Sequence, residues 1–208
     1  MATDDLLAAG AAGPGHPFAD PARTQEDVEV LHELTAVLAA AADAPGRTDG
    51  WRHWTNRLGT HRLLVPSWAR LAAASSARGV GFFGQLRPAD DDTFPPTLEP
   101  RVAEAGAREG WLLAYLNVRF APAPGADAPR YGNLVVLTDR EAAIATLDGC
   151  PEHVEAVERS PGAYRSLRIH RLVLDGAPLS LPPLRVTSTL YRDYATTPPW
   201  GAVRVGDG

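Results

Sequence analysis

The chain has 208 residues, of which 45% are hydrophobic, so its length suits one domain of ordinary size and is short for two sizeable cores. Its 25 acidic and 20 basic residues give a net charge of −5, and no basic run with interleaved aromatic residues is present, which argues against nucleic acid as a partner. All 20 basic residues are arginine, and the absence of lysine excludes Schiff-base catalysis and the phosphate-binding loop that ends in Gly-Lys-Ser/Thr.

The sequence also indicates in which cellular compartment the protein is expected. No stretch approaches the roughly 18 consecutive apolar residues that a membrane span requires, and the N-terminus opens with acidic residues where a secretory signal carries basic ones. The single cysteine, Cys150, has no second cysteine with which to form an internal disulfide. We therefore expect a cytoplasmic protein that does not use a membrane as a partner.

The first part of the chain divides into a tail and a helical extension. Residues 1–23 are rich in Ala, Gly, Pro and Asp without periodicity, and we expect them to be disordered or loosely ordered. Apolar residues at helical spacing predict a helix over 25–42, and two shorter helices are predicted at 49–58 and 66–77. We interpret residues 24–77 as a helical extension packed on the main domain.

From residue 78 the pattern changes to alternating strands and helices. Strands are predicted at 79–88, 111–120, 130–138 and 164–174, with a helix at 97–109 and a broken helix over 139–160. This β-α-β-β-α-β order is typical of a ferredoxin-like fold of the α+β class. An alternating stretch at 184–194 adds an edge strand or reaches a partner subunit. The main domain is thus expected over 78–194, and residues 195–208 are expected to form a C-terminal tail.

One long stretch resembles a known superfamily. The run LTDREAAIATLDGCPEHVEAVERSPGAYRSLRIHRLVL has an acidic residue after a strand, Glu-Ala at a helix start, Pro-x-His-x-x-Ala within the helix, and a closing strand. In these features it resembles the second half of the dimeric α+β barrel proteins, which include antibiotic-biosynthesis monooxygenases, polyketide cyclases and haem-binding enzymes. The resemblance covers roughly residues 78–175 and implies a homodimeric barrel. Leu137 stands where many of these proteins have Trp.

Each predicted strand has one plainly apolar side and a second, mixed side. If the more apolar side faces the helices, the second sides converge across the sheet and form a polar and aromatic pocket between sheet and partner. A second interpretation stays open, in which these residues form a face exposed to water. The second sides carry Phe83, Gln85, Arg87, Tyr115, Asn117, Arg119, Tyr131, Asn133, Ser166, Arg168 and His170.

The candidate catalytic residues are His170, Arg168 and Asn117. A neutral His170 would take a proton from a carbon acid or phenol, and Arg168 or Arg119 would stabilise the resulting anion. On this interpretation His170→Asn leaves the fold intact and removes turnover. The substrate-binding candidates are Tyr115, Arg119, Asn133, Tyr131, Gln85, Arg87 and Phe83, and no metal site is expected because no histidine pair has ligand spacing.

The resemblance implies an enzyme of secondary metabolism, a cofactor-independent monooxygenase or cyclase that acts on a polyketide-like or aromatic small molecule. A haem-binding enzyme with His153 or His170 as iron ligand is an alternative, and so is a non-catalytic ligand-binding or assembly protein. A homodimer through the sheet faces is expected, because the second sides carry too many apolar groups to be left in water. The N-terminal extension could supply this cover instead.

Overall fold

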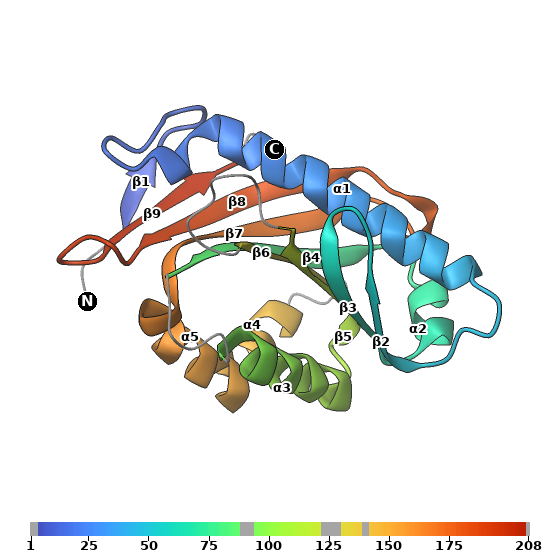
Figure 1. Ribbon diagram of the computed structural model, residues 1–208. Helices are drawn as coiled ribbons and strands as arrows, with labels where there is room; N and C mark the ends of the chain where they lie inside the picture. The colour runs from blue at the N-terminus through green and yellow to red at the C-terminus, as the bar shows by residue number, and fades with distance from the viewer. Residues whose placement is uncertain (1–3, 88–93, 122–129, 139–141, 207–208) are drawn as a thin grey trace.

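A curved sheet runs through the protein, and helices cover both of its faces (Figure 1). The computed structural model describes residues 4–87, 94–121, 130–138 and 142–206, and within this part of the chain nine strands form one sheet in the order β1-β9-β8-β7-β4-β6-β5-β3-β2. Neighbouring strands are antiparallel, except that β1 and β9 run parallel.

The strands alternate with helices along the chain. The helices are α1 (Pro21–Asp43), α2 (Trp68–Ala73), α3 (Phe94–Glu109), α4 (Ala142–Gly149) and α5 (Pro151–Ala163), and short 3-10 turns lie at Pro17–Ala19 and Pro178–Ser180. The strands are β1 (Asp5–Leu7), β2 (Gly50–Thr55), β3 (Gly59–Val65), β4 (Ala77–Leu86), β5 (Leu112–Phe120), β6 (Arg130–Thr138), β7 (Tyr164–Leu174), β8 (Leu184–Asp193) and β9 (Trp200–Val205). None of the helices in the described ranges is both long enough and apolar enough to span a membrane.

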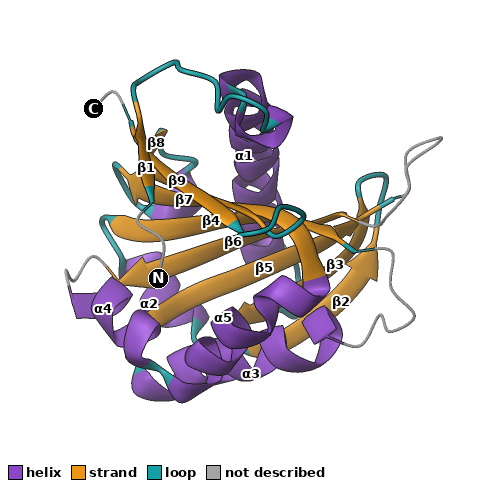
Figure 2. Cartoon of the chain, turned by 90° about the vertical axis from the view of Figure 1, so that its left-hand side faces the viewer, coloured by secondary structure: helices purple, strands orange, loops and turns teal. Residues whose placement is uncertain are grey.

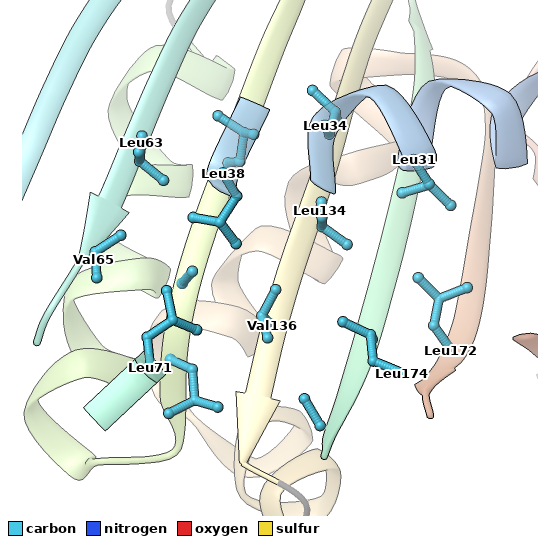
Figure 3. Close-up of a cluster of buried hydrophobic side chains, with 14 of the residues drawn as sticks. Leu31, Leu34, Leu38, Leu63, Val65, Leu71, Leu134, Val136, Leu172 and Leu174 are labelled. Carbon is cyan, nitrogen blue, oxygen red and sulfur yellow. The ribbon is translucent and has the colours of Figure 1, made fainter. Parts of the chain in front are cut away.

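The long helix α1 covers one face of the sheet. It begins where the Asp20 carboxylate accepts a hydrogen bond from the backbone N–H of Ala22, with Pro21 at the first helical position. Its leucines at helical spacing meet apolar side chains of the strands (Figure 3). A Cβ built on Gly81 of β4 would lie 2.8 Å from Leu31, so the glycine lets α1 approach the sheet closely. The residues in this core include Leu31, Leu34, Leu38, Leu63, Val65, Leu134, Val136, Leu172 and Leu174.

Helices α3, α4 and α5 cover the opposite face, which looks away from α1 (Figure 2). Trp111 is 5% exposed and packs into a notch on α3, where a Cβ added to Gly106 would lie 2.3 Å from the indole ring. The core of this side also contains Leu112, Tyr115 and Leu137. Both faces of the central strands are therefore buried within one chain.

The expected ferredoxin-like fold, and with it the dimeric α+β barrel, is wrong. The sheet does not end at four strands: β3 and β2 extend it beyond β5, and β8, β9 and β1 extend it beyond β7. The expectation failed because short strands such as β1 and β9 have too little alternation to be recognised, and they form by pairing with an existing edge. The second face is covered by α1, so a second subunit is not needed to bury it.

Two local predictions also need correction. The helix expected at 49–58 is a hairpin of β2 and β3, whose turn is held by the Asn56 side chain accepting the backbone N–H of Leu58. The segments expected to be a loose N-terminus and a C-terminal tail contribute β1 and β9, which pair with each other. Chain ends that are tied into a sheet in this way gain order that their composition does not predict.

Candidate functional site

The candidate site is a cavity of about 300 Å³ between the sheet and helices α3, α4 and α5. Its wall is mostly apolar, a composition typical of ligand sites, which combine apolar surface with a few placed polar groups. Val157 of α5 lines the cavity although it is 54% exposed, so the cavity meets solvent beside this helix. The apolar lining includes Val80, Phe82, Leu98, Val135, Leu167 and Ile169.

The Glu99 carboxyl forms the polar end of this cavity. Glu99 lies on α3, and its side chain is 13% exposed. The Arg62 guanidinium lies 3.0 Å from Oε2, and the Tyr115 hydroxyl donates to the same oxygen over 3.0 Å. The Tyr164 hydroxyl donates to Oε1 over 3.4 Å, and the Asn117 amide donates to Oε2 over 3.3 Å. One carboxyl of α3 is thus held by groups from β3, β5 and β7.

The strand register explains why these groups meet. Arg62, Asn117 and Asn133 are direct cross-strand neighbours on β3, β5 and β6, so their side chains share the face that looks toward α3. The Asn117 amide donates to Asn133 Oδ1 over 2.6 Å, and both asparagines are buried. Such a row of hydrogen-bonded side chains is rigid, which fixes the place of the Glu99 carboxyl above it.

The surroundings of Glu99 change its acidity. Burial raises the pKa of the Glu99 carboxyl, and the opposing effects of Arg62 and of the hydrogen bonds from Tyr115, Asn133 and Tyr164 do not cancel this rise. Burial, together with the nearby carboxylate, raises the pKa of Tyr115 and of Tyr164 well above the usual value, so both hydroxyls stay protonated and can donate. A carboxyl of this kind can take up and release a proton nearer to neutral pH than an exposed one.

A second polar region lines the cavity at the start of α5. His153 lies there beside Asp148 and Arg171, and its Nδ1 is buried without a hydrogen-bond partner in the described structure. Burial lowers the pKa of the His153 ring, which favours the neutral imidazole. Across the ranges that the structure describes, no three His, Cys, Asp or Glu side chains are grouped so that they could hold a metal ion.

The structure divides the residues expected on one face between both faces. Tyr115, Asn117 and Asn133 meet at Glu99, and Arg119 and Tyr131 are paired farther along the same face, with the guanidinium 5.9 Å from the ring. The site residues expected on β4 and β7 lie on the α1 face instead. These are Phe83, Gln85, Ser166, Arg168 and His170. Arg87, at the end of β4, donates to the carbonyls of Pro161 and Tyr194.

His170 does not reach the cavity, so the predicted approach of His170 and Arg168 to Asn117 and Asn133 is wrong. The imidazole is fully buried beneath α1, with Nε2 2.9 Å from Asp27 Oδ2 and Nδ1 2.9 Å from Thr189 Oγ1. Arg168 donates to both oxygens of the same carboxylate, over 2.5 and 2.8 Å. The prediction failed because helices cover both faces, so the apolar side of a strand does not reveal which helices it meets.

The sequence analysis missed three members of the site: Glu99, Arg62 and Tyr164. Glu99 had a detectable signal, because it occupies the same helical stripe as Val102 and Ala103 and is the charged position on that apolar side. Arg62 lies on β3, which was not predicted because a helix was expected at 49–58 in place of the first strand of the β2–β3 hairpin. Tyr164 is the first residue of its strand.

Comparisons with protein-family models, with curated proteins and with solved structures found no match for this chain. The function is therefore inferred from the geometry and chemistry of the cavity.

Proposed function

We propose that this protein is an enzyme that binds a small, mainly apolar organic molecule in the cavity and transfers a proton to or from it through Glu99. The observation that carries the proposal is a buried carboxyl with a raised pKa, facing an apolar cavity of about 300 Å³. Glu99 has an ion-pair partner in Arg62, as structural carboxylates of a protein interior normally do, yet burial keeps its pKa raised. A carboxyl whose pKa is raised at a cavity wall is typical of general acid–base catalysis.

The neighbouring groups suit this chemistry. The Glu99 carboxylate would remove a proton from a carbon next to a carbonyl group, or from a hydroxyl group, of the bound molecule. As Glu99 takes up the proton, the Tyr115 hydroxyl, which stays protonated, would release Glu99 Oε2 and donate its hydrogen bond to the oxygen on which negative charge develops. Arg62, 3.0 Å from Glu99, would stabilise the anionic stage of the cycle. Ring closure of an aromatic or polyketide-like substrate, as expected from the sequence, belongs to this class of reaction.

All groups of the proposed site come from a single chain. Its groups come from α3, β3, β5 and β7, and α1 of the same chain covers the sheet face for which a second subunit was expected. We therefore propose that proton transfer does not depend on dimerisation. A reducing compartment such as the cytoplasm suits the single cysteine, Cys150, which is a free and buried thiol.

The proposal is tested by proton exchange on a model carbon acid. 1-Tetralone, an aromatic ketone with exchangeable protons next to its carbonyl group, is incubated with the protein in D₂O, and deuterium uptake is followed by NMR. We expect exchange above the background rate, and a decrease of about 10²- to 10⁴-fold for Glu99→Gln. Glu158→Gln, which makes the same change on the exposed side of α5, should exchange at the wild-type rate.

Three outcomes separate catalysis from binding alone. Exchange that depends on Glu99 supports the enzyme. Binding of 1-tetralone without faster exchange, seen as NMR shifts of cavity residues, would leave a non-catalytic binding protein. The absence of both binding and exchange would contradict the proposal. Native mass spectrometry and absorbance near 400 nm of the purified protein would then show whether another ligand, haem included, occupies the cavity.

A further inference from the structure

A second cleft, of about 380 Å³, lies on the α1 face of the sheet, on the side opposite Glu99. The 3-10 turn at Pro17–Ala19 and the first turns of α1 form one wall, and strands β4, β6 and β7 form the floor. The proposed proton transfer at Glu99 uses none of the residues that line this cleft. Its chemistry therefore needs a separate explanation.

Three polar side chains lie in a row on the floor of the cleft. Gln85 of β4 is the direct cross-strand neighbour of Arg130 on β6 and of Ser166 on β7. Side chains in such positions share one face, with Cβ atoms about 4.5–5.5 Å apart. All three line the cleft, so one guanidinium, one amide and one hydroxyl converge on the same space.

Two of these groups make no side-chain hydrogen bond within the part of the chain that the structure describes. Ser166 is 6% exposed, yet neither its hydroxyl nor the Gln85 amide makes a side-chain hydrogen bond to any residue that the structure describes. Buried polar groups in folded proteins nearly always have a partner, which is a protein group, water or a ligand. Because Ser166 and Gln85 line the cleft, their polar groups are available there to a ligand or to water.

The charges at the cleft favour an anion. Two carboxylates line it, but each has a cation of its own: Glu26 pairs with Arg23 at 2.7 Å, and Asp27 pairs with Arg168. Arg130 is exposed, and within the described structure its guanidinium makes no ion pair and lies 5.3 Å from the centre of the Phe120 ring. One guanidinium therefore remains to bind an anionic group, beside two neutral groups that can donate hydrogen bonds.

Apolar side chains border the polar row. Phe83 is the next residue of β4 on this face, and Phe18, Val30 and Phe120 line the cleft around it. These apolar side chains offer a surface for the carbon part of a ligand, and they make the site unlike one for a bare inorganic ion.

We propose that this cleft binds a small organic oxyanion, a carboxylate or a phosphate ester, at a second site that is separate from the Glu99 cavity. Arg130, Gln85 and Ser166 donate hydrogen bonds to the anionic group, and the apolar part of the molecule lies against Phe83 and Phe120. Because the ligand would contact α1 and three strands together, it would also tie the start of α1 to the sheet.

Binding of two anionic probes and one neutral probe tests the proposal. Phenyl phosphate, benzoate and benzyl alcohol are titrated separately into the full-length protein and followed by NMR of the backbone amides. We expect phenyl phosphate, benzoate or both to shift the amides of Gln85 and Ser166, and benzyl alcohol to leave them unchanged. The two anions distinguish a phosphate ester from a carboxylate as the preferred ligand.

Variants assign the binding to the polar row. Arg130→Gln should weaken binding of the anionic probe by about tenfold or more, as expected for loss of a charge-assisted contact, and Ser166→Ala should weaken it less. Arg165→Gln removes the same charge from an exposed neighbour of Ser166 and should bind as wild type does. Glu99→Gln should also leave this binding unchanged, which separates it from the first site.

Several results would overturn the second site. One is the failure of both anions to bind, and another is equal affinity of wild type and Arg130→Gln. Shifts confined to the residues around Glu99 would place the probe in the other cavity. Comparable binding of benzyl alcohol would mean that the cleft recognises the ring alone. Since Arg130 and Arg165 are both exposed, we expect these variants to fold, and wild-type melting temperatures would verify it.

Discussion

Asp27 and Glu99 lie on opposite faces of the sheet, and the pKa values of their carboxyls shift in opposite directions. Asp27, on the sheet-facing side of α1, contacts Arg168 through both carboxylate oxygens and His170 through one. Burial alone would raise its pKa, but the hydrogen bonds and charges of Arg168 and His170 outweigh burial and lower the pKa. Glu99, on the sheet-facing side of α3, contacts one guanidinium and neutral donors, and burial raises its pKa. Burial alone therefore does not decide whether a carboxyl stays ionised.

The difference separates a structural role from a chemical one. Asp27 connects α1 to β7 and, through His170 and Thr189, to β8. Both of its carboxylate oxygens are occupied by Arg168 and His170, which favours the ionised carboxylate. Glu99 lies at the wall of an open cavity, and its ionisation is less favoured. The same chemical group, a carboxyl, thus fastens a helix on one face and serves as the candidate proton donor and acceptor on the other.

The largest expected effect is on stability and comes from Asp27→Asn. This change leaves Arg168, whose side chain is 15% exposed, without its carboxylate, and loss of one partner of a buried ion pair typically costs about 3–5 kcal/mol of unfolding free energy. Urea denaturation at pH 7 measures the loss. Glu29→Gln, on the exposed side of the same helix, is the control and should change the free energy by less than about 0.5 kcal/mol. A similar small change for Asp27→Asn would show that the pair does not fasten α1.

The pH dependence of this loss has a definite sign. Because the pKa of Asp27 is lowered in the folded protein, its contribution to stability is complete above the unfolded carboxyl pKa of about 4 and is lost as the pH falls through the folded value. The difference in stability between wild type and Asp27→Asn should therefore shrink in acid. A difference that grew in acid would contradict the assignment.

His170→Asn is expected to lower stability and to leave proton transfer unchanged, the reverse of the outcome predicted from the sequence. An asparagine side chain is too short to contact both Asp27 and Thr189, so at least one buried group loses its partner, at a cost of about 1–3 kcal/mol. Melting temperature and 1-tetralone exchange measure the two effects. His32→Asn, on the exposed side of α1, is the control. Loss of exchange without loss of stability would restore His170 as a catalytic candidate.

Substitution of two neighbouring valines of β6 allows the packing on the two faces of the sheet to be compared. Val136 is 1% exposed and packs under α1, whereas Val135 lines the cavity at Glu99. Val136→Ala opens a void in a filled core and should cost about 2 kcal/mol. Val135→Ala enlarges a space that already exists, so its cost should be about 1 kcal/mol or less. Thermal denaturation of both variants gives the comparison, and equal losses would mean that the cavity wall is packed as tightly as the α1 core.

The smallest expected effect is the change of stability with pH for Glu99→Gln. Because the pKa of Glu99 is raised in the folded protein, its contribution to stability is complete below the unfolded value of about 4.3 and is lost as the pH rises through the folded value. The melting temperature of Glu99→Gln relative to wild type should therefore increase with pH, opposite in sign to Asp27→Asn. Glu158→Gln should show no such trend, and a flat difference for Glu99→Gln would argue against a raised pKa.

The sequence by itself determined several elements but not their arrangement. Alternation in WLLAYLNVRF and YRSLRIHRLVL predicted β5 and β7, and apolar spacing predicted α1, because these elements are long and their periods are strong. Alternation also grouped Tyr115 and Asn117 on one side of β5. Such patterns depend only on neighbours along the chain, so one sequence is enough to reveal them.

Only the tertiary structure decided which side of each strand faces which helices. The hairpin β2–β3, the pairing of β1 with β9 and the cover supplied by α1 all depend on contacts between distant segments. Glu99 and Arg62 are 37 residues apart and become neighbours only when α3 packs across β3 and β5. The candidate site was hidden from the sequence because a carboxyl acquires its acidity from the groups that the fold brings around it, and local patterns do not encode those contacts.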